Sequence, residues 1–259
     1  MKVVTHAKEL PSACAFVPTM GALHAGHASL FQIAKNYSEY VVASIFINPL
    51  QFESASDLAQ YPRTPESDIE LAASSGVTHL WLPHYEEIYP DGFVTLQADT
   101  IGEKFEGTAR PGHFDGVVTV VRRLFDLVKP RYAIFGEKDF QQLFLIKKIA
   151  QEVEIIAAPT MRDADGLAMS SRNIHLSEKG RNAATVIYRS LTQAKSESDL
   201  QALLAKEPLF ELDYATLIDE DTFQPATATT AHVRAIVAGW IDGVRLIDNM
   251  AMKSALVRA

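Results

Sequence analysis

Two histidines lie three residues apart in the segment VPTMGALHAGH, residues 17–27. An apolar run ends at Pro18, Gly21 permits a tight turn, and we expect a helix to begin around His24. The free N–H groups at a helix start bind phosphate, and imidazoles at the same place add hydrogen bonds to it. His24 and His27 therefore indicate a phosphate site. Capping or surface histidines are the alternative, and zinc lacks a convincing third ligand beside them.

A second segment, FGEKDFQQL at residues 135–143, joins an apolar run to glycine, then to charged residues and an expected helix. A lysine at such a point neutralises phosphate oxygens, which is the role we expect for Lys138. Gln142 follows one turn into the helix, near the same rim. The alternative is a charged helix start whose side chains are solvated.

A third segment, DGLAMSSRN at residues 165–173, places two hydroxyls beside a guanidinium. Ser170, Ser171 and Arg172 form a compact set of donors with no adjacent carboxylate to consume it. Such a set is suited to binding a pyrophosphate leaving group. The segment lies at a predicted domain boundary, so it could close over a nucleotide as a lid.

A fourth segment, SIFINPLQF at residues 44–52, breaks an apolar strand at Asn48-Pro49. The amides of Asn48 and Gln51 are then exposed where the strand ends. An uncharged amide both donates and accepts, which suits hydroxyl and carboxylate groups of a substrate. Taken alone, the segment is better explained by an ordinary turn.

These four segments must be positioned by strands and helices, and the pattern of apolar residues predicts which ones. Short apolar runs predict buried strands at residues 13–17, 41–47, 77–82, 132–135 and 153–157. Helical spacing follows His27, runs through 114–128 and resumes after Asp139. Apolar strands alternating with amphipathic helices predict a parallel sheet covered on both faces, with ligands at the carboxyl ends of the strands.

The pattern changes after about residue 160. One long helix is predicted over 177–205, and alternating segments at 212–218 and 231–240 read as strands of a smaller α+β unit. We therefore predict two domains, residues 1–160 and 161–259.

Composition narrows the class of protein. The formal net charge of −8 over 259 residues repels a polyanion, which argues against nucleic acid as the main partner. The single cysteine, Cys14, forms no intramolecular disulfide. The start of the chain lacks the apolar core of a signal peptide, and the longest apolar run, VVASIFI, is too short to cross a membrane. A cytoplasmic enzyme fits, as does a cytoplasmic binding protein.

Three tempting sites carry little weight. His79, His84 and His113 do not have a metal-ligand spacing. The Arg122–Arg123 pair lies on the polar side of an amphipathic helix, which favours a solvated face. A hydrolase nucleophile at Ser170 or Ser171 would lack the strained Gly-x-Ser-x-Gly turn.

Read together, seven segments resemble bacterial pantothenate synthetases in order and spacing, from about residue 13 to 250. They are VPTMGALHAGH, FINPLQF, YPRTPESD, FEGTARPGHFDGV, FGEKDFQQL, DGLAMSSRN and RLIDNM. The resemblance implies a Rossmann-like ATP- and pantoate-binding domain, a smaller C-terminal α+β lid domain and a homodimer. It also implies that pantoate is adenylated by ATP and then passed to β-alanine, releasing pyrophosphate and AMP.

The resemblance also implies site residues. His24, His27, Lys138 and Arg172 would be catalytic, and Gln51 and Gln142 would hold pantoate and β-alanine. Magnesium would be held mainly by the ATP phosphates, with no protein residue assigned to it. The residues expected to line the ATP site are Met20, Gly21, Ala22, Leu23, His24, Ala25, Gly26, His27, Gly136, Glu137, Lys138, Asp139, Met161, Met169, Ser170, Ser171 and Arg172.

Some features depart from the resemblance or compete with it. The segment before Pro18 is short, Ala25 occupies a commonly acidic position, and His175 stands where an aromatic residue is common. Another nucleotidylyltransferase acting on a different acid is the nearest rival. A non-catalytic nucleotide-binding regulator is the rival from another class, although all four catalytic groups are present. An aminoacyl-tRNA synthetase is disfavoured because the chain is short and acidic.

Overall fold

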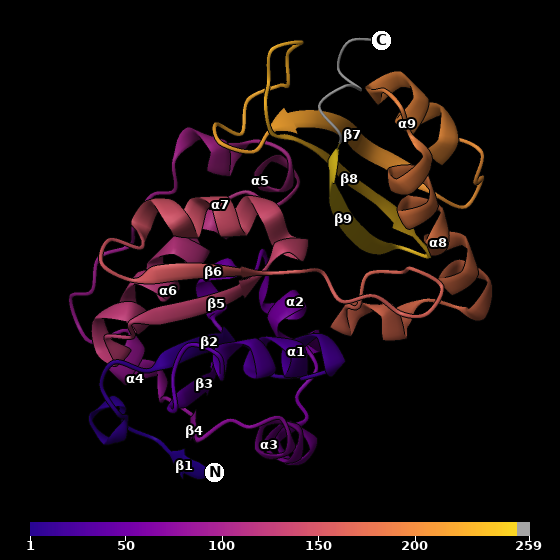
Figure 1. Cartoon of the computed structure of the whole chain (residues 1–259). Coiled ribbons are helices and arrows are strands. Elements are labelled where there is room, and N and C mark those ends of the chain that lie inside the picture. The colour runs from indigo at the N-terminus through magenta and orange to yellow at the C-terminus, as the bar shows by residue number, and fades with distance from the viewer. Residues whose placement is uncertain (253–259) are drawn as a thin grey trace. The chain divides into compact units, whose positions relative to one another are not determined.

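A computed structural model describes residues 1–252, and Figure 1 traces its elements. The chain divides into two compact units. Unit 1 comprises residues 1–137 and 141–159, and unit 2 comprises 138–140 and 160 onward. The residues 253–259 of the predicted second domain lie outside the described part. The segment 138–140 therefore groups with the C-terminal unit, although its neighbours in sequence belong to unit 1.

Unit 1 contains a six-stranded sheet in the order β1-β4-β3-β2-β5-β6. Every pairing is parallel, which confirms the predicted sheet. The predicted strands all occur, with ends shifted by a few residues, and a short strand at the N-terminus was not predicted. The bounds are β1 Lys2–Val4, β2 Ala15–Thr19, β3 Val41–Ile45, β4 His79–Trp81, β5 Tyr132–Gly136 and β6 Glu154–Ala158.

The sheet buries both of its faces. On β2, Ala15 and Val17 pack with Phe31 and Ala34 of the helix α1 (Ala25–Ala34). Phe16, between them, is also fully buried, and alternation along a strand points it to the opposite face. The helix α6 (His113–Val128) contacts β2 but contributes no residue to the apolar cluster that contains Phe31 and Ala34, so it covers the second face.

The helices of unit 1 include the three that the periodicity predicts, after His27, over 114–128 and after Asp139. Short 3-10 helices link several elements. The α-helices are α1 Ala25–Ala34, α2 Ala55–Gln60, α3 Pro65–Ser74, α4 Tyr85–Ile88, α5 Glu106–Ala109, α6 His113–Val128 and α7 Phe140–Ile149, and the 3-10 helices are η1 Ala7–Glu9, η2 Pro49–Gln51, η3 Thr100–Glu103 and η4 Glu137–Asp139. Two residues of η4 and the first residue of α7 belong to the segment 138–140 of unit 2.

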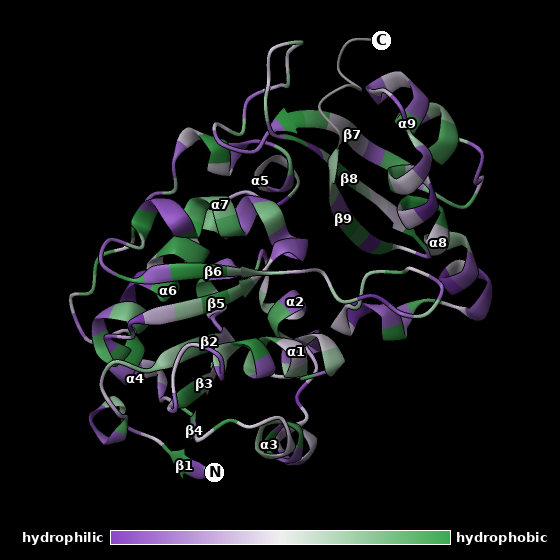
Figure 2. Ribbon diagram, in the orientation of Figure 1, coloured by the Kyte–Doolittle hydropathy of each residue, from purple (hydrophilic) through white to green (hydrophobic). Residues whose placement is uncertain are grey.

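Up to residue 252, unit 2 is a three-stranded antiparallel sheet with two α-helices packed against it. Both helices mix hydrophilic and hydrophobic residues in Figure 2, as expected where one helix face meets a core. Asp242 and Gly243, both with positive φ, join the last two strands in a two-residue hairpin. The bounds are η5 Ser171–His175, α8 Glu178–Gln193, α9 Glu197–Leu204, β7 Glu211–Asp219, β8 Val233–Ile241 and β9 Val244–Met252.

The prediction of one helix over 177–205 is wrong. The chain leaves helical geometry at Ala194, whose ψ is 140°, and α9 starts anew. Ser196 caps α9, because its side chain accepts a hydrogen bond from the N–H of Asp199 at 3.1 Å. A serine followed three residues later by an acidic residue is a helix start signal, and here it wins over the continuing apolar spacing.

Candidate active site

The loop after β2 has an unusual backbone that a buried carboxylate holds in place. Gly21 and Ala22 both have positive φ, 84° and 51°. Asp68, at the start of α3 and only 1% exposed, accepts the N–H of Ala22 at 3.0 Å and that of Leu23 at 2.7 Å. A Cβ at position 21 would come within 3.0 Å of the same carboxylate. Only glycine therefore fits there without a shift.

His24 and His27 cap α1 reciprocally. The Nδ1 of His24 accepts the N–H of Gly26 at 3.1 Å, and the Nδ1 of His27 accepts the N–H of His24 at 3.2 Å. The ring centroids are 4.2 Å apart. An accepting Nδ1 carries no hydrogen, so in each neutral ring the hydrogen is on Nε2. The capping role weighed above is thus real, and it fixes each Nε2 as a donor.

Gln51 is buried after β3 in a polar cluster. Its Oε1 accepts from the Nδ2 of Asn48 at 3.0 Å, and its carbonyl accepts from the imidazole of His113 at 2.9 Å. Asn48 in turn accepts from the hydroxyl of Tyr89 at 2.7 Å, and burial raises the pKa of that hydroxyl. Asn48 therefore uses the oxygen of the Gln51 amide, whereas the amide nitrogen of Gln51 makes no hydrogen bond within residues 1–252.

The topology gathers these loops at one edge of the sheet. The adjacent parallel strands β3 and β2 are followed by Gln51 and by the two histidines respectively, and β5 ends at Gly136. The chain turns to opposite sides after β2 and β5, which makes this edge a topological switch point. A Cβ at Gly136 would meet no atom within 4 Å, so the space beside the end of β5 is open.

Two neighbouring glutamines of α7 do different things. Gln141 is buried and donates to the carbonyls of Ile101 and Lys104, both at 2.7 Å. Gln142 is half-buried, and within residues 1–252 its side chain makes no hydrogen bond. Gln141 thereby holds the preceding loop, whereas both the donor and the acceptor of the Gln142 side chain stay unused within residues 1–252.

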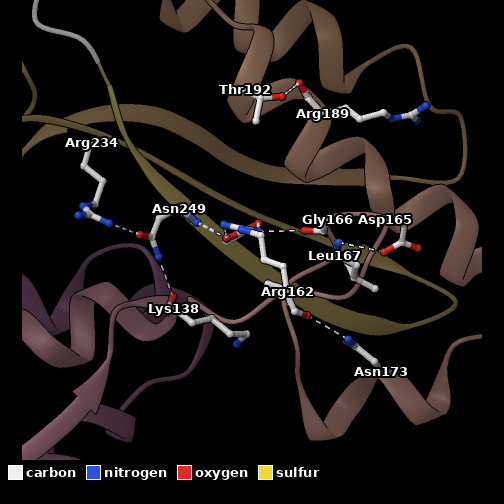
Figure 3. Close-up of polar contacts among 12 residues, drawn as sticks. Lys138, Arg162, Asp165, Gly166, Leu167, Asn173, Arg189, Thr192, Arg234 and Asn249 are labelled. Carbon is white, nitrogen blue, oxygen red and sulfur yellow. Dashed lines mark hydrogen bonds and ion pairs between the residues drawn. The ribbon is translucent and has the colours of Figure 1, made fainter. Parts of the chain in front are cut away.

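In unit 2, Lys138 is attached to the C-terminal sheet through its backbone (Figure 3). The Nδ2 of Asn249 donates to the Lys138 carbonyl at 2.8 Å. The ammonium lies 3.8 Å from the carboxylate of its neighbour Asp139. The side chain of Lys138 is 20% exposed and runs away from Asn249 in Figure 3. The sheet therefore binds the Lys138 backbone and does not neutralise the charge of its ammonium.

The segment that carries Met161 and Met169 is a small hairpin. The N–H of Met169 donates to the carbonyl of Met161 at 3.0 Å, and Arg162 pairs with Ala168. Arg162 also donates to the carboxylate of Asp248 through two bonds, at 2.6 and 2.9 Å. Met161 remains 42% exposed. The hairpin is thus fixed to β9 through its arginine.

The donors at the end of this hairpin are accessible. Ser170 caps η5 by accepting the N–H of Arg172 at 3.3 Å. Arg172 is exposed, and up to residue 252 no carboxylate forms an ion pair with it. Arg181 instead occupies the nearby acidic groups, at 2.7 Å from Asp163 and 2.6 Å from Asp165. This arrangement agrees with the sequence argument that no carboxylate consumes the guanidinium of Arg172.

The predicted site residues therefore form two groups, one in each unit. Unit 1 holds Met20 to His27, Gln51, Gly136, Glu137 and Gln142, and unit 2 holds Lys138, Asp139, Met161 and Met169 to Arg172. Sequence reasoning missed the residues that hold these groups in place. They are Asp68, Tyr89, Gln141, Arg162, Arg234, Asp248 and Asn249.

Two further properties bear on the class of site. Among the described residues, no group of three or more His, Cys, Asp or Glu side chains is arranged to hold a metal ion. In the same part of the chain, no helix has the length and apolarity that crossing a membrane requires.

Comparison with known proteins gives one consistent result. Residues 1–251 match the family model described as pantoate-beta-alanine ligase. The pantothenate synthetase of Acidothermus cellulolyticus is 44% identical over 93% of this chain and 86% of its own length. The crystal structure of pantothenate synthetase from Thermus thermophilus is 41% identical, with a TM-score of 0.91, covering 96% of this chain and 99% of that one.

A second solved structure adds ligands. It is the pantoate-beta-alanine ligase of Francisella tularensis, complexed with β-γ ATP and β-alanine. That protein is 37% identical to this chain, and the TM-score is 0.83 over 96% of this chain and 97% of the other.

Proposed function

This chain belongs to the pantoate–β-alanine ligase family and is an enzyme of that activity, and we propose that it works through a pantoyl-adenylate. A carboxylate oxygen of pantoate attacks the α-phosphorus of ATP, and the bond to pyrophosphate breaks. The amine of β-alanine then attacks the acyl carbon, loses a proton, and AMP leaves with the bridging oxygen. Pantothenate, AMP and pyrophosphate are the products.

The observation that carries this proposal is the reciprocal cap of His24 and His27 at the switch-point loop. Both rings spend Nδ1 on the backbone, so both are donors through Nε2. Donors at a helix start suit the phosphates of a nucleotide. We assign His27 to stabilising phosphate charge and not to proton transfer, because a carboxylate nucleophile has no proton to lose.

The nucleotide is ATP, as the ligands of the Francisella relative support. An anionic nucleophile has to approach an anionic phosphate, so positive charge around the triphosphate lowers the barrier. We assign that charge to Lys138 and Arg172, together with the hydroxyls of Ser170 and Ser171. The rest of the predicted ATP set, including Met20, Gly136 and Met161, lines the nucleotide.

Magnesium belongs to the nucleotide in this proposal. The described residues offer no cluster of three carboxylate or imidazole ligands, whereas a triphosphate with water ligands satisfies the octahedral preference of this ion. When bound, the ion supplies charge neutralisation at the phosphates. The histidines, Lys138 and Arg172 would still be needed to orient the chain of phosphates.

We assign Gln51 and Gln142 to the acyl substrates. Asn48 holds the Gln51 oxygen, which leaves the amide nitrogen to donate to the carboxylate or hydroxyls of pantoate. Gln142 carries both hydrogen-bonding functions within the same unit. An uncharged pair matches a substrate with hydroxyls and one carboxylate better than a cationic pair would, which disfavours a phosphorylated substrate.

Two further parts of the proposal rest on family likeness. We propose that the enzyme is a homodimer acting in the cytoplasm, and that residues 161–259 act as a lid over the nucleotide. Light scattering of the purified protein tests the dimer.

The test of the function is turnover by purified protein with ATP and magnesium. Pantoate alone should release pyrophosphate up to about one equivalent of enzyme, since the adenylate stays bound, and adding β-alanine should start continuous formation of AMP and pantothenate. Formation of ADP in place of AMP would overturn the proposal, as would pyrophosphate release that is independent of pantoate.

A further inference from the structure

We propose that Asn249 of β9 is a positioning residue for Lys138, oriented by Arg234. The inference rests on the role proposed above for Lys138. None of the steps described so far uses the segment RLIDNM, which carries Asn249, yet its side chains hold the two ATP-binding segments of unit 2. All the contacts that follow lie within unit 2.

The Asn249 amide joins the lysine backbone to a buried arginine. Its Nδ2 donates to the Lys138 carbonyl at 2.8 Å, across 111 residues of sequence. Its Oδ1 accepts from the Nη1 of Arg234 at 2.6 Å. Asn249 is 4% exposed and Arg234 6%. Figure 3 shows the amide between these two partners.

The orientation of the amide follows from the chemistry of its partners. A guanidinium only donates, so it requires the amide oxygen. A backbone carbonyl only accepts, so it requires the amide nitrogen. Arg234 and Lys138 therefore select one orientation of the Asn249 side chain, and the flip that often leaves an amide ambiguous is excluded.

Arg234 also contacts the segment 138–140, through the ring of Phe140. Its Nε donates to Glu220 at 2.9 Å, and its guanidinium lies 4.0 Å above the ring of Phe140. The Phe140 ring stacks on Phe223 at 6.0 Å between centroids. Residues 138–140 are consequently held at two points, the Lys138 carbonyl and the Phe140 ring. This explains why they group with the C-terminal sheet and not with their sequence neighbours.

Asp248, the residue before Asn249 in β9, holds the hairpin that carries Met161 and Met169. Asp248 is 4% exposed and binds Arg162 of the hairpin through both carboxylate oxygens. Its Oδ1 also accepts the backbone N–H of Asn249 at 2.8 Å. Successive side chains of a strand point to opposite faces, which lets two adjacent residues reach two different segments. β9 therefore holds both the Lys138 backbone and the hairpin that leads to Arg172, and so sets the distance between them.

The consequence for catalysis is positional. Asn249 contacts the Lys138 carbonyl and not the ammonium. Removing the Asn249 amide therefore keeps the positive charge but frees the backbone that positions the lysine side chain. A misplacement of about 1 Å at a reacting site costs roughly 100-fold in rate. The effect should fall on adenylation, where Lys138 acts, and should vanish when the lysine side chain is absent.

The test uses Asn249→Asp in the full-length enzyme. Aspartate keeps the shape and the oxygen that accepts from Arg234, but it removes the N–H that Lys138 needs. Asn182→Asp is the matched control, because it makes the same charge change on the exposed side of α8. Lys138→Ala and the double variant Asn249→Asp/Lys138→Ala complete the set. The readout is single-turnover pyrophosphate formation from ATP, magnesium and pantoate, with β-alanine omitted.

We expect Asn249→Asp to slow pyrophosphate formation roughly 10- to 100-fold, with melting behaviour close to wild type. Asn182→Asp should stay within about twofold of wild type, and the double variant within about twofold of Lys138→Ala. A merely structural role would instead multiply the two losses in the double variant. That result, or a folded Asn249→Asp at the wild-type rate, would overturn the inference.

Two outcomes separate this inference from the function on which it rests. A slow Lys138→Ala beside a fast Asn249→Asp overturns the inference alone. A Lys138→Ala variant at the wild-type rate overturns the role of the lysine and the inference with it. If Asn249→Asp does not fold, Asn249→Ser, which also removes the amide donor but adds no charge, is judged by the same limits.

Discussion

The carboxylate of Asp68 accepts the backbone N–H of Leu23 at 2.7 Å, across 45 residues of sequence. The same carboxylate accepts the N–H of Ala22 and the hydroxyl of Thr64, both at 3.0 Å. One buried side chain in α3 therefore holds the loop that leads into His24. The loop needs such support because two consecutive residues in it have positive φ, one of them alanine.

We predict that Asp68→Asn destabilises the protein and slows adenylation. Asparagine would turn an N–H group towards a loop N–H, leaving a buried donor unpaired at a cost of about 1–3 kcal/mol. Denaturant unfolding measures the first effect and pyrophosphate formation the second. Glu70→Gln removes the same charge from an exposed position of α3 and should change neither. Equal behaviour of the two variants would show that Asp68 does not hold the loop.

His27→Glu separates the capping role of this histidine from its phosphate role. A glutamate at the third position of a helix can reach back to the capping residue's N–H, so the fold should survive. An ionised carboxylate only accepts, so the donor at Nε2 is lost, and we expect adenylation to fall by at least roughly 100- to 1000-fold, as for removal of a single preorganised donor. His27→Ala should lose the same activity and about 1 kcal/mol of stability as well. Normal pyrophosphate release from either folded variant would contradict the assigned role.

Stability should depend on pH through Asp165. The hydrogen bond from Arg181 holds the pKa of this carboxyl below its ordinary value of 3.8. A pKa that is lower in the folded state stabilises the protein above 3.8, and the contribution is lost as pH falls through the folded value. Melting temperatures of wild type and Asp165→Asn should differ at about pH 7, and the difference should shrink as the pH falls below 3.8.

The size of this effect is limited by exposure. The side chains of Asp165 and Arg181 are 42% and 28% exposed, so solvent screens the pair and the difference should stay below about 1 kcal/mol. A difference that grows as the solution is made more acidic would have the opposite sign and would refute the assignment.

Cys14 should be inert in the native protein. It is fully buried, and burial raises the pKa of its thiol to about 12. Because the thiolate is the reactive form, a thiol reagent at neutral pH should label the folded enzyme only as fast as it unfolds. Denaturant should expose one thiol per chain, the single cysteine of the sequence. Rapid labelling without denaturant would contradict the buried position beside β2.

The sequence predicted the parallel sheet well because its strands are short apolar runs separated by amphipathic helices. It failed where the signal was short or local. β1 has only three residues, two of them exposed, and shows no alternation to recognise. β9 was missed although Asp242-Gly243 is a strong hairpin signal between two alternating runs. The break at Ala194 was hidden because apolar residues on either side keep a helical spacing.

The candidate site divides in the same way. Groups that we assign to a ligand were visible because each set is contiguous in sequence, as in HAGH or SSRN. The groups that hold them were not, because Asp68, Asp248 and Asn249 act on residues 45, 86 and 111 positions away. Gln141 and Gln142 show a further limit. Two identical neighbours differ in role only because one is buried against the carbonyls of Ile101 and Lys104.

The most direct test of the central claim follows an oxygen atom. Pantoate labelled in its carboxylate with a heavy oxygen isotope is turned over with ATP, magnesium and β-alanine, and the products are weighed by mass spectrometry. If the carboxylate attacks the α-phosphorus, AMP leaves with one labelled oxygen and pantothenate keeps the other. Unlabelled AMP, or label found in inorganic phosphate, would contradict a pantoyl-adenylate and with it the roles assigned to His27 and Lys138.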